Sequence, residues 1–222
     1  MKNFVFIFLV FTAFSFAQDL KNEPEKKQFP AEVQSQNLKE VLEIKEFQKE
    51  LNEEYKNENE SPLRGDNFKK FKAHPFFAIN LDFYVKAKLV KTENATPFEL
   101  PTSSGKNKKY KEFGKVYFKI NGAEQVLTVY QSLDLIRNPE YKDYLFLPFK
   151  DATSGKETYG GGRYLDLKIP NHDELIIDFN KAYHPYCAYN ATDYNCPIVP
   201  QENWLKIPIE AGVKYEDIWF EH

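Results

Sequence analysis

The sequence predicts a mainly β fold of the α+β type, in which one amphipathic N-terminal helix packs on an antiparallel barrel or sandwich. Three observations lead to this prediction. Apolar and polar residues alternate in several stretches of residues 79–209, as they do in strands with one buried face. No such stretch is followed by the helix of roughly 10–15 residues that parallel βαβ units contain. One stretch with helical periodicity precedes them all.

The helix is expected to begin at Asn37, because Glu40 follows at the spacing of a capping box. Charged residues cover its other face, and Ser61-Pro62 predicts that it ends before that point. A short second helix is expected at residues 66–71. The apolar positions with helical spacing are Val41, Ile44, Phe47, Leu51 and Tyr55.

The strands follow from residue 79 onward. Asn121-Gly122 stands between two alternating stretches and predicts a tight hairpin, because both residues tolerate the positive φ angles of that turn. Strands are expected at residues 79–89, 116–120, 125–131, 144–149, 164–169, 175–179 and 204–209.

The N-terminus has the pattern of a cleaved signal peptide. Lys2 precedes an apolar run from Phe4 to Phe16, and Ser15 and Ala17 supply small residues for cleavage. This run is shorter than the roughly 20 residues that span a bilayer, and no later stretch is long enough. We expect a signal peptide at residues 1–17, a flexible tether at 18–36 and a single domain at 37–222. The protein would then be exported and periplasmic or extracellular.

Charge and motif content exclude several classes. The net charge of −3 argues against a nucleic-acid binder, which normally carries a basic excess. Phosphate-binding glycine motifs, the His-Glu-x-x-His zinc motif, the Gly-x-Ser-x-Gly elbow and Cys-x-x-Cys are all absent from the sequence. We therefore predict neither a cofactor nor a metal site.

Two cysteines, Cys187 and Cys196, lie in the exported part. A disulfide is the first interpretation in an oxidising compartment, and it would contribute roughly 2.5–3 kcal/mol for a loop of this length. Two alternatives use His184: a nucleophile formed with Cys187, and a zinc site formed with both cysteines and a further ligand.

Two loop regions are candidates for a site. The first runs from Asp151 to Arg163 and combines hydroxyl groups, an aromatic ring and three consecutive glycines. Glycines permit close approach of a ligand, and Arg163 could bind a carboxylate or phosphate. Alternatively, Arg163 pairs with Asp151 or Asp166. The further candidate ligand-binding residues in this region are Thr153, Ser154 and Tyr159.

The second region, residues 178–204, is irregular and rich in proline and aromatic residues. Such stretches often display functional groups from a rigid frame. Here Asn180 and Asn203 would orient a ligand by hydrogen bonds, and Tyr183, or Tyr159 from the first region, would stack on it.

Both regions lie within a resemblance that covers most of the chain. Residues 46–212 resemble the bacterial domain-of-unknown-function family 1684. His184 stands where that pattern has Asn, and the family name implies no activity. The motifs that carry the resemblance are Glu46-Phe47, Ser61-Pro62-Leu63, Leu100-Pro101-Thr102, residues 147–155, Thr158-Tyr159, residues 162–166, Asp178-Phe179-Asn180, Ala182-Tyr183, Pro185, Cys187-Ala188-Tyr189, Cys196-Pro197, Pro200, Glu202-Asn203 and Ala211-Gly212.

Three functions follow from these observations. The leading hypothesis is a binding module of the bacterial envelope for a small polar or anionic ligand. The second is a hydrolase in which two of Asp151, Asp178 and Glu202 converge as acid and base. The third is a structural or protein-partner domain, in which Arg163 belongs to a buried ion pair.

Overall fold

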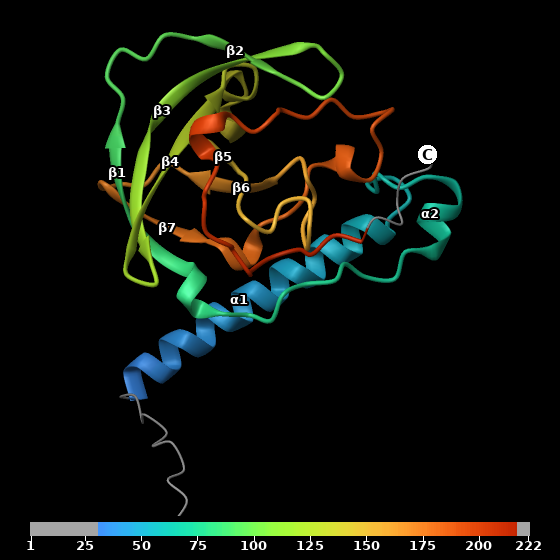
Figure 1. The fold of residues 1–222 in the computed structure, drawn as a ribbon, viewed down its shortest axis with the longest axis horizontal. Coiled ribbons are helices and arrows are strands. Elements are labelled where there is room, and N and C mark those ends of the chain that lie inside the picture. Colours follow the sequence, from blue (N-terminus) through green and yellow to red (C-terminus); the bar gives the residue numbers. More distant parts are fainter. Residues whose placement is uncertain (1–30, 217–222) are drawn as a thin grey trace, which may run out of the picture.

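The protein is seen here in a computed structural model that describes residues 31–216 (Figure 1). The predicted signal peptide at residues 1–17 and residues 18–30 of the predicted tether lie outside the described residues. Within residues 31–216, no helix is both long and apolar enough to cross a membrane.

Seven strands form one curled sheet in the order β6-β5-β4-β3-β1-β7, and β2 pairs with β3 outside this path. Every strand pair is antiparallel, which confirms the predicted mainly β fold. The strands are β1 (Tyr84–Lys91), β2 (Phe98–Pro101), β3 (Asn107–Ile120), β4 (Ala123–Ser132), β5 (Tyr144–Phe149), β6 (Arg163–Lys168) and β7 (Glu174–Asp178).

The sheet curls into a half-barrel whose two edges approach each other. The segment that follows β7 returns to β6, where the backbones of Tyr164 and Tyr183 exchange hydrogen bonds of 2.8 and 3.1 Å. The inner face is filled by apolar side chains of opposing strands, and Val116, Leu127 and Ile177 are fully buried there. Burial of this face is the main source of stability.

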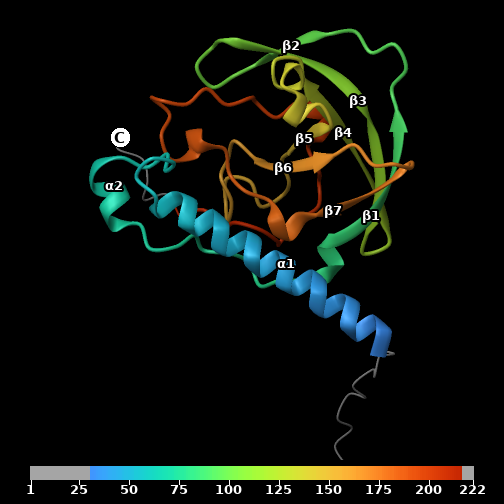
Figure 2. The ribbon, with the colours of Figure 1, turned by 180° about the vertical axis from the view of Figure 1, so that it is seen from behind.

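Helix α1 (Ala31–Lys56) lies across one end of the half-barrel, and α2 (Gly65–Lys70) follows near its C-terminal end (Figures 1 and 2). Ile44, Leu51 and Tyr55 of α1 are buried, which confirms the predicted apolar face. The expected start at Asn37 is wrong, because α1 already begins at Ala31. The last residues of the expected tether are therefore helical.

The hairpin prediction is confirmed. Asn121 and Gly122 have φ angles of 50° and 78° and join β3 to β4. The structure differs elsewhere: Leu81–Phe83 is a 3-10 turn, and no strand forms at 204–209. Strand β2 was not predicted, because it is short and only Leu100 is buried in it.

The remaining elements are short 3-10 helices. Three of them carry residues that the sequence singled out, namely Asn180, Cys187, and Glu202 with Asn203. The 3-10 helices are Leu81–Phe83, Leu135–Arg137, Pro139–Tyr141, Phe179–Lys181, Tyr186–Ala188 and Gln201–Asn203.

Candidate functional site

Arg163 lies in the interior and forms an ion pair with Asp151. The Nη2–Oδ2 distance is 2.5 Å, and both side chains are fully buried. The guanidinium also donates to the backbone oxygens of Ile209, at 2.8 Å, and Ala211, and it lies over the Phe149 ring. The expectation that Arg163 offers its charge to a ligand is not met in this geometry. The alternative of a pair with Asp151 is the one observed.

Asp151 also organises the loop that follows. Its Oδ1 accepts hydrogen bonds from the backbone N–H and the hydroxyl of Thr153, at 2.6 and 2.5 Å. The Ser154 hydroxyl in turn accepts the backbone N–H of Asp151 at 3.1 Å. Asp151, Thr153 and Ser154 thus build a turn. Their polar atoms, which were expected to contact a ligand, form hydrogen bonds with one another instead.

The asparagines of the second region act as internal braces. Asn203 is fully buried; its amide donates to the backbone oxygens of Thr128 and Pro148 at 2.8 and 2.7 Å. It thereby joins β4, β5 and the C-terminal segment. Asn180 is also buried. Its side-chain oxygen accepts the Asn80 backbone N–H at 2.9 Å, and its side-chain amide donates to the Asn80 backbone oxygen at 3.0 Å.

The three candidate catalytic carboxylates do not share a site. Asp151 pairs with Arg163, Asp178 accepts from Asn180 at the end of β7, and Glu202 is exposed and accepts the Tyr130 hydroxyl at 2.8 Å. None of them lines the cavity described below. Burial raises the pKa of Asp178, although its bonds to Asn180 oppose that change.

Tyr159 packs against the buried ring of His184, which accepts the Tyr159 backbone N–H on Nε2 at 3.3 Å. His184 Nδ1 lies 3.0 Å from the Tyr189 hydroxyl, and that hydroxyl lies 3.3 Å from Nδ1 of His74. Burial lowers the pKa of His184 well below its usual value, and the nearby Arg163 charge adds to this. His184 therefore belongs to a neutral internal chain of rings.

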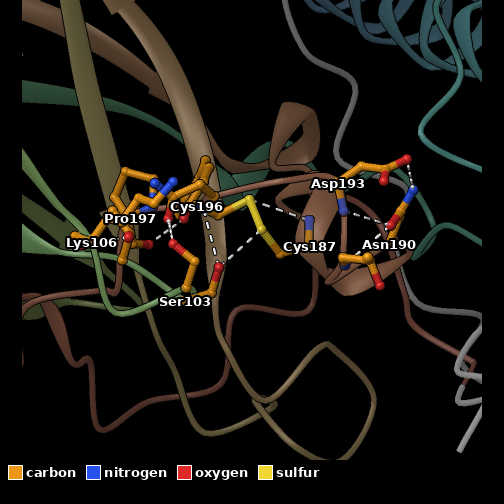
Figure 3. The surroundings of a disulfide bond; sticks show 12 residues. Ser103, Lys106, Cys187, Asn190, Asp193, Cys196 and Pro197 are labelled. Carbon is orange, nitrogen blue, oxygen red and sulfur yellow. Dashed lines mark hydrogen bonds between the residues drawn. A yellow bond between two sulfur atoms is a disulfide. The ribbon is translucent and has the colours of Figure 1, made fainter.

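Cys187 and Cys196 form a disulfide, with a Cα–Cα distance of 6.1 Å (Figure 3). This confirms the predicted pairing over the nucleophile and zinc alternatives. Ser103, in the turn between β2 and β3, holds the bridge: its hydroxyl donates to Cys187 Sγ and accepts from the Cys196 backbone N–H, both at 3.2 Å. The loop closed by the disulfide is thereby fixed to the sheet.

A cavity of about 470 Å³ lies between α1, β6 and the disulfide loop. Aromatic rings and carboxylates dominate its wall, and Tyr183 is the only predicted ligand-binding residue in it. We call it the tyrosine cavity. It is lined by Phe47, Leu51, Glu54, Lys108, Tyr164, Asp166, Tyr183, Pro185, Tyr186, Asp193, Tyr194, Asn195, Cys196 and Pro197.

Asp166 is the most organised polar group of this wall. Its Oδ1 accepts the hydroxyls of Tyr144 at 2.6 Å and Tyr183 at 2.9 Å, and Oδ2 lies 2.9 Å from the Tyr183 hydroxyl. Asp166 keeps an exposed edge; partial desolvation raises its pKa, and the two tyrosine bonds oppose the shift. Desolvation also raises the pKa of Tyr183 well above its usual value, and the Asp166 charge adds to it. The tyrosines therefore remain donors that hold a carboxylate at the cavity.

From the sequence, Asp166 was expected only as a possible partner of Arg163, although part of the signal for its position was present. Alternate residues of a strand face opposite sides. Since Arg163 points inward on β6, Tyr164 and Asp166 share the other face, together with Tyr183 across the strand pair. A tyrosine and an aspartate two residues apart on one face were the available signal.

The fold and cavity define a β-rich half-barrel domain with a tyrosine-walled pocket bordered by a helix and a disulfide loop. Residues 69–214 match the family described as protein of unknown function (DUF1684), and the chain belongs to this family. An uncharacterized protein of Haloarcula marismortui, solved by solution NMR, is similar at 28% identity with a TM-score of 0.63. The alignment covers 86% of this chain and 100% of that one. No curated protein matches the chain.

Proposed function

We propose that the protein is an exported binding module that holds a small polar ligand in the tyrosine cavity. The observation that carries this proposal is the placement of Asp166, which is anchored by two tyrosine hydroxyls on the wall of a cavity large enough for a small molecule. Pockets of this kind combine apolar walls with a few fixed polar groups that orient a ligand.

The walls of the cavity support a preformed site. Tyr183 is tied by its backbone to Tyr164 and by its hydroxyl to Asp166, and the opposite wall is a loop closed by the Cys187–Cys196 bridge. Groups that are already fixed lose little conformational entropy on binding. Export is part of the proposal and is supported by the apolar run and small residues of positions 4–17 and by the disulfide.

A cavity-filling variant tests the proposal without assuming the chemistry of the ligand. Asn195 is half-buried in the cavity wall, so Asn195→Trp should occupy the space. Asn59, in an exposed turn away from the cavity, provides the matched control Asn59→Trp. The probes are sugars, amines, carboxylates, phosphates and nucleotides, each screened by thermal shift at high concentration.

A ligand at 100 times its Kd stabilises a protein by about 2.7 kcal/mol, which raises the Tm of a domain of this size by roughly 5–10 °C. We expect at least one probe class to produce such a shift in the wild type and in Asn59→Trp, and none in Asn195→Trp. An equal shift in Asn195→Trp would place binding elsewhere. No shift with any probe would argue for a structural or protein-partner role instead.

A further inference from the structure

We propose that the ligand of the tyrosine cavity carries an organic cation, an amine or quaternary ammonium group, that binds against Asp166 while the tyrosine rings pack on its carbon atoms. This inference rests on the proposed function and names the ligand class. It replaces the anionic ligand expected from the sequence, because the arginine on which that expectation depended is buried against Asp151.

The hydrogen bonds of Asp166 leave it suited to a donor or a cation. Two tyrosine hydroxyls donate to it, and most of this donation falls on Oδ1. An ionised carboxylate accepts about four hydrogen bonds, so Oδ2 keeps capacity beyond the contact with Tyr183. A carboxylate or phosphate brought to the same point would meet a negative charge and no free donor from these two tyrosines.

The charges around the cavity also favour a cationic ligand. Its wall contains the carboxylates of Glu54, Asp166 and Asp193 and one basic side chain, Lys108. Asp193 is paired with Arg64 at 3.4 Å, and Glu54 accepts the Tyr186 hydroxyl.

Asp166 and Glu54 differ from Asp193 in their charge balance. Neither carboxylate belongs to an ion pair within residues 35–216. Tyrosine hydroxyls hold both, two on Asp166 and one on Glu54, so a cationic ligand would supply the opposite charge at the cavity.

Aromatic rings stand where the carbon atoms of such a ligand would lie. The rings of Tyr164 and Tyr183 meet edge to face, with centroids 6.1 Å apart, and Tyr186 and Tyr194 do so at 4.9 Å on the other side. The electron-rich faces of such rings attract cations, above all alkylated ammonium groups. Asp166 itself is exposed, so a ligand can reach its carboxylate.

An organic cation fits better than a metal ion. In the described part of the chain, no three His, Cys, Asp or Glu side chains are placed to hold a metal. Hard divalent cations take about six or more oxygen ligands, whereas the three carboxylates on this wall do not form such a cluster. An ammonium group needs only one such carboxylate and an apolar surround.

The test compares three probe classes at matched ionic strength by isothermal titration: tetramethylammonium, choline and putrescine as cations, glucose as a neutral probe, and acetate and phosphate as anions. We expect at least one cation to bind the wild type more tightly than the neutral and anionic probes. Asp166→Asn should weaken that cation at least tenfold. Asp66→Asn is the matched control, since Asp66 lies on α2, pairs with Lys69 at 3.3 Å and has an exposed side chain; it should bind as the wild type does.

A second variant keeps the test informative if Asp166→Asn fails to fold. Tyr194→Leu removes a half-buried ring that packs on Tyr186, and it should weaken the same cation several-fold. Binding of glucose or of an anion in place of the cations would overturn this inference while leaving the proposed function intact. Cation binding unchanged in both variants would also overturn it. Absence of binding by every probe would overturn the inference and the proposed function together.

Discussion

Two aspartates, Asp151 and Asp166, lie on opposite sides of strand β6. From the sequence, both were possible partners of Arg163. On the inner side of β6, Asp151 is buried, paired with Arg163 and bonded to its own turn. On the other side, Asp166 is held by two tyrosine hydroxyls at the wall of the tyrosine cavity. The first carboxylate has its charge neutralised within the protein, and the second does not. The comparison shows that the buried, ion-paired carboxylate belongs to the framework, whereas the carboxylate at the cavity wall, held by two neutral donors, marks the candidate site.

The largest expected effect is on the buried side. Arg163→Ala would leave Asp151 buried without a partner, and removal of one member of a buried ion pair typically costs about 3–5 kcal/mol. We expect a loss of this size in chemical denaturation. The double variant Arg163→Met, Asp151→Asn should recover part of the stability, because no unpaired charge then remains. A stable Arg163→Ala that loses only ligand binding would reverse the roles assigned to the two sides of β6.

The disulfide should contribute the next largest effect. Replacing both Cys187 and Cys196 by Ser removes a bridge over a short loop, and we expect a loss of roughly 2–3 kcal/mol by denaturation. Because this loop carries Asp193, Tyr194 and Asn195 of the cavity wall, binding at the cavity should weaken as well. A dithiol reductant should lower the stability of the wild type toward that of the double variant. If the reductant changes the double variant by the same amount, the effect does not come from this bridge.

The neutral chain of rings behind Arg163 predicts a pH dependence. Burial lowers the pKa of His74 from 6.5 to about 3, so His74 stays neutral in the folded protein while it becomes charged in the unfolded chain below pH 6.5. The unfolded state then binds more protons, and the stability that depends on neutral His74 is lost as the pH falls from about 6.5 toward 3. It is fully present above that range.

His74→Phe isolates this contribution. Phe keeps the edge-to-face packing on Tyr55 and cannot be protonated, although it gives up the hydrogen bond to Tyr189. The stability difference between wild type and His74→Phe should shrink as the pH is lowered from 7 to 4, measured by urea denaturation at each pH. A difference that is constant over this range would show that His74 does not titrate between the two states.

The elements that could be predicted from the sequence are those in which local pattern and tertiary burial agree. The apolar face of α1 follows from its period, the Asn121-Gly122 turn from turn chemistry, and the span of β5 from a short continuous apolar run. No strand forms at residues 204–209, because the alternation there reflects contacts of an irregular segment. Asn203 joins this segment to β4 and β5 by hydrogen bonds. These hydrogen bonds join residues far apart in the chain, so no local sequence pattern predicts them.

The candidate site was harder to predict for a related reason. Within the loops, the glycines, the hydroxyls and Arg163 were plausible ligand contacts, and only burial distinguishes Arg163 from a surface group. Asp166 owes its position to Tyr144 on β5 and Tyr183 beyond β7. Those pairings depend on strand order, which composition and spacing do not specify.

The smallest expected effect on stability falls on the site itself. Asp166→Asn keeps an acceptor for the tyrosine hydroxyls and removes a charge at the cavity wall, so we expect a cost of about 1 kcal/mol or less, in line with single hydrogen bonds. In the same denaturant, Asp166→Asn should lose much less unfolding free energy than Arg163→Ala. It should nevertheless have the larger effect on cation binding. If Asp166→Asn proves as destabilising as Arg163→Ala, the two aspartates are both structural, and the contrast across β6 disappears.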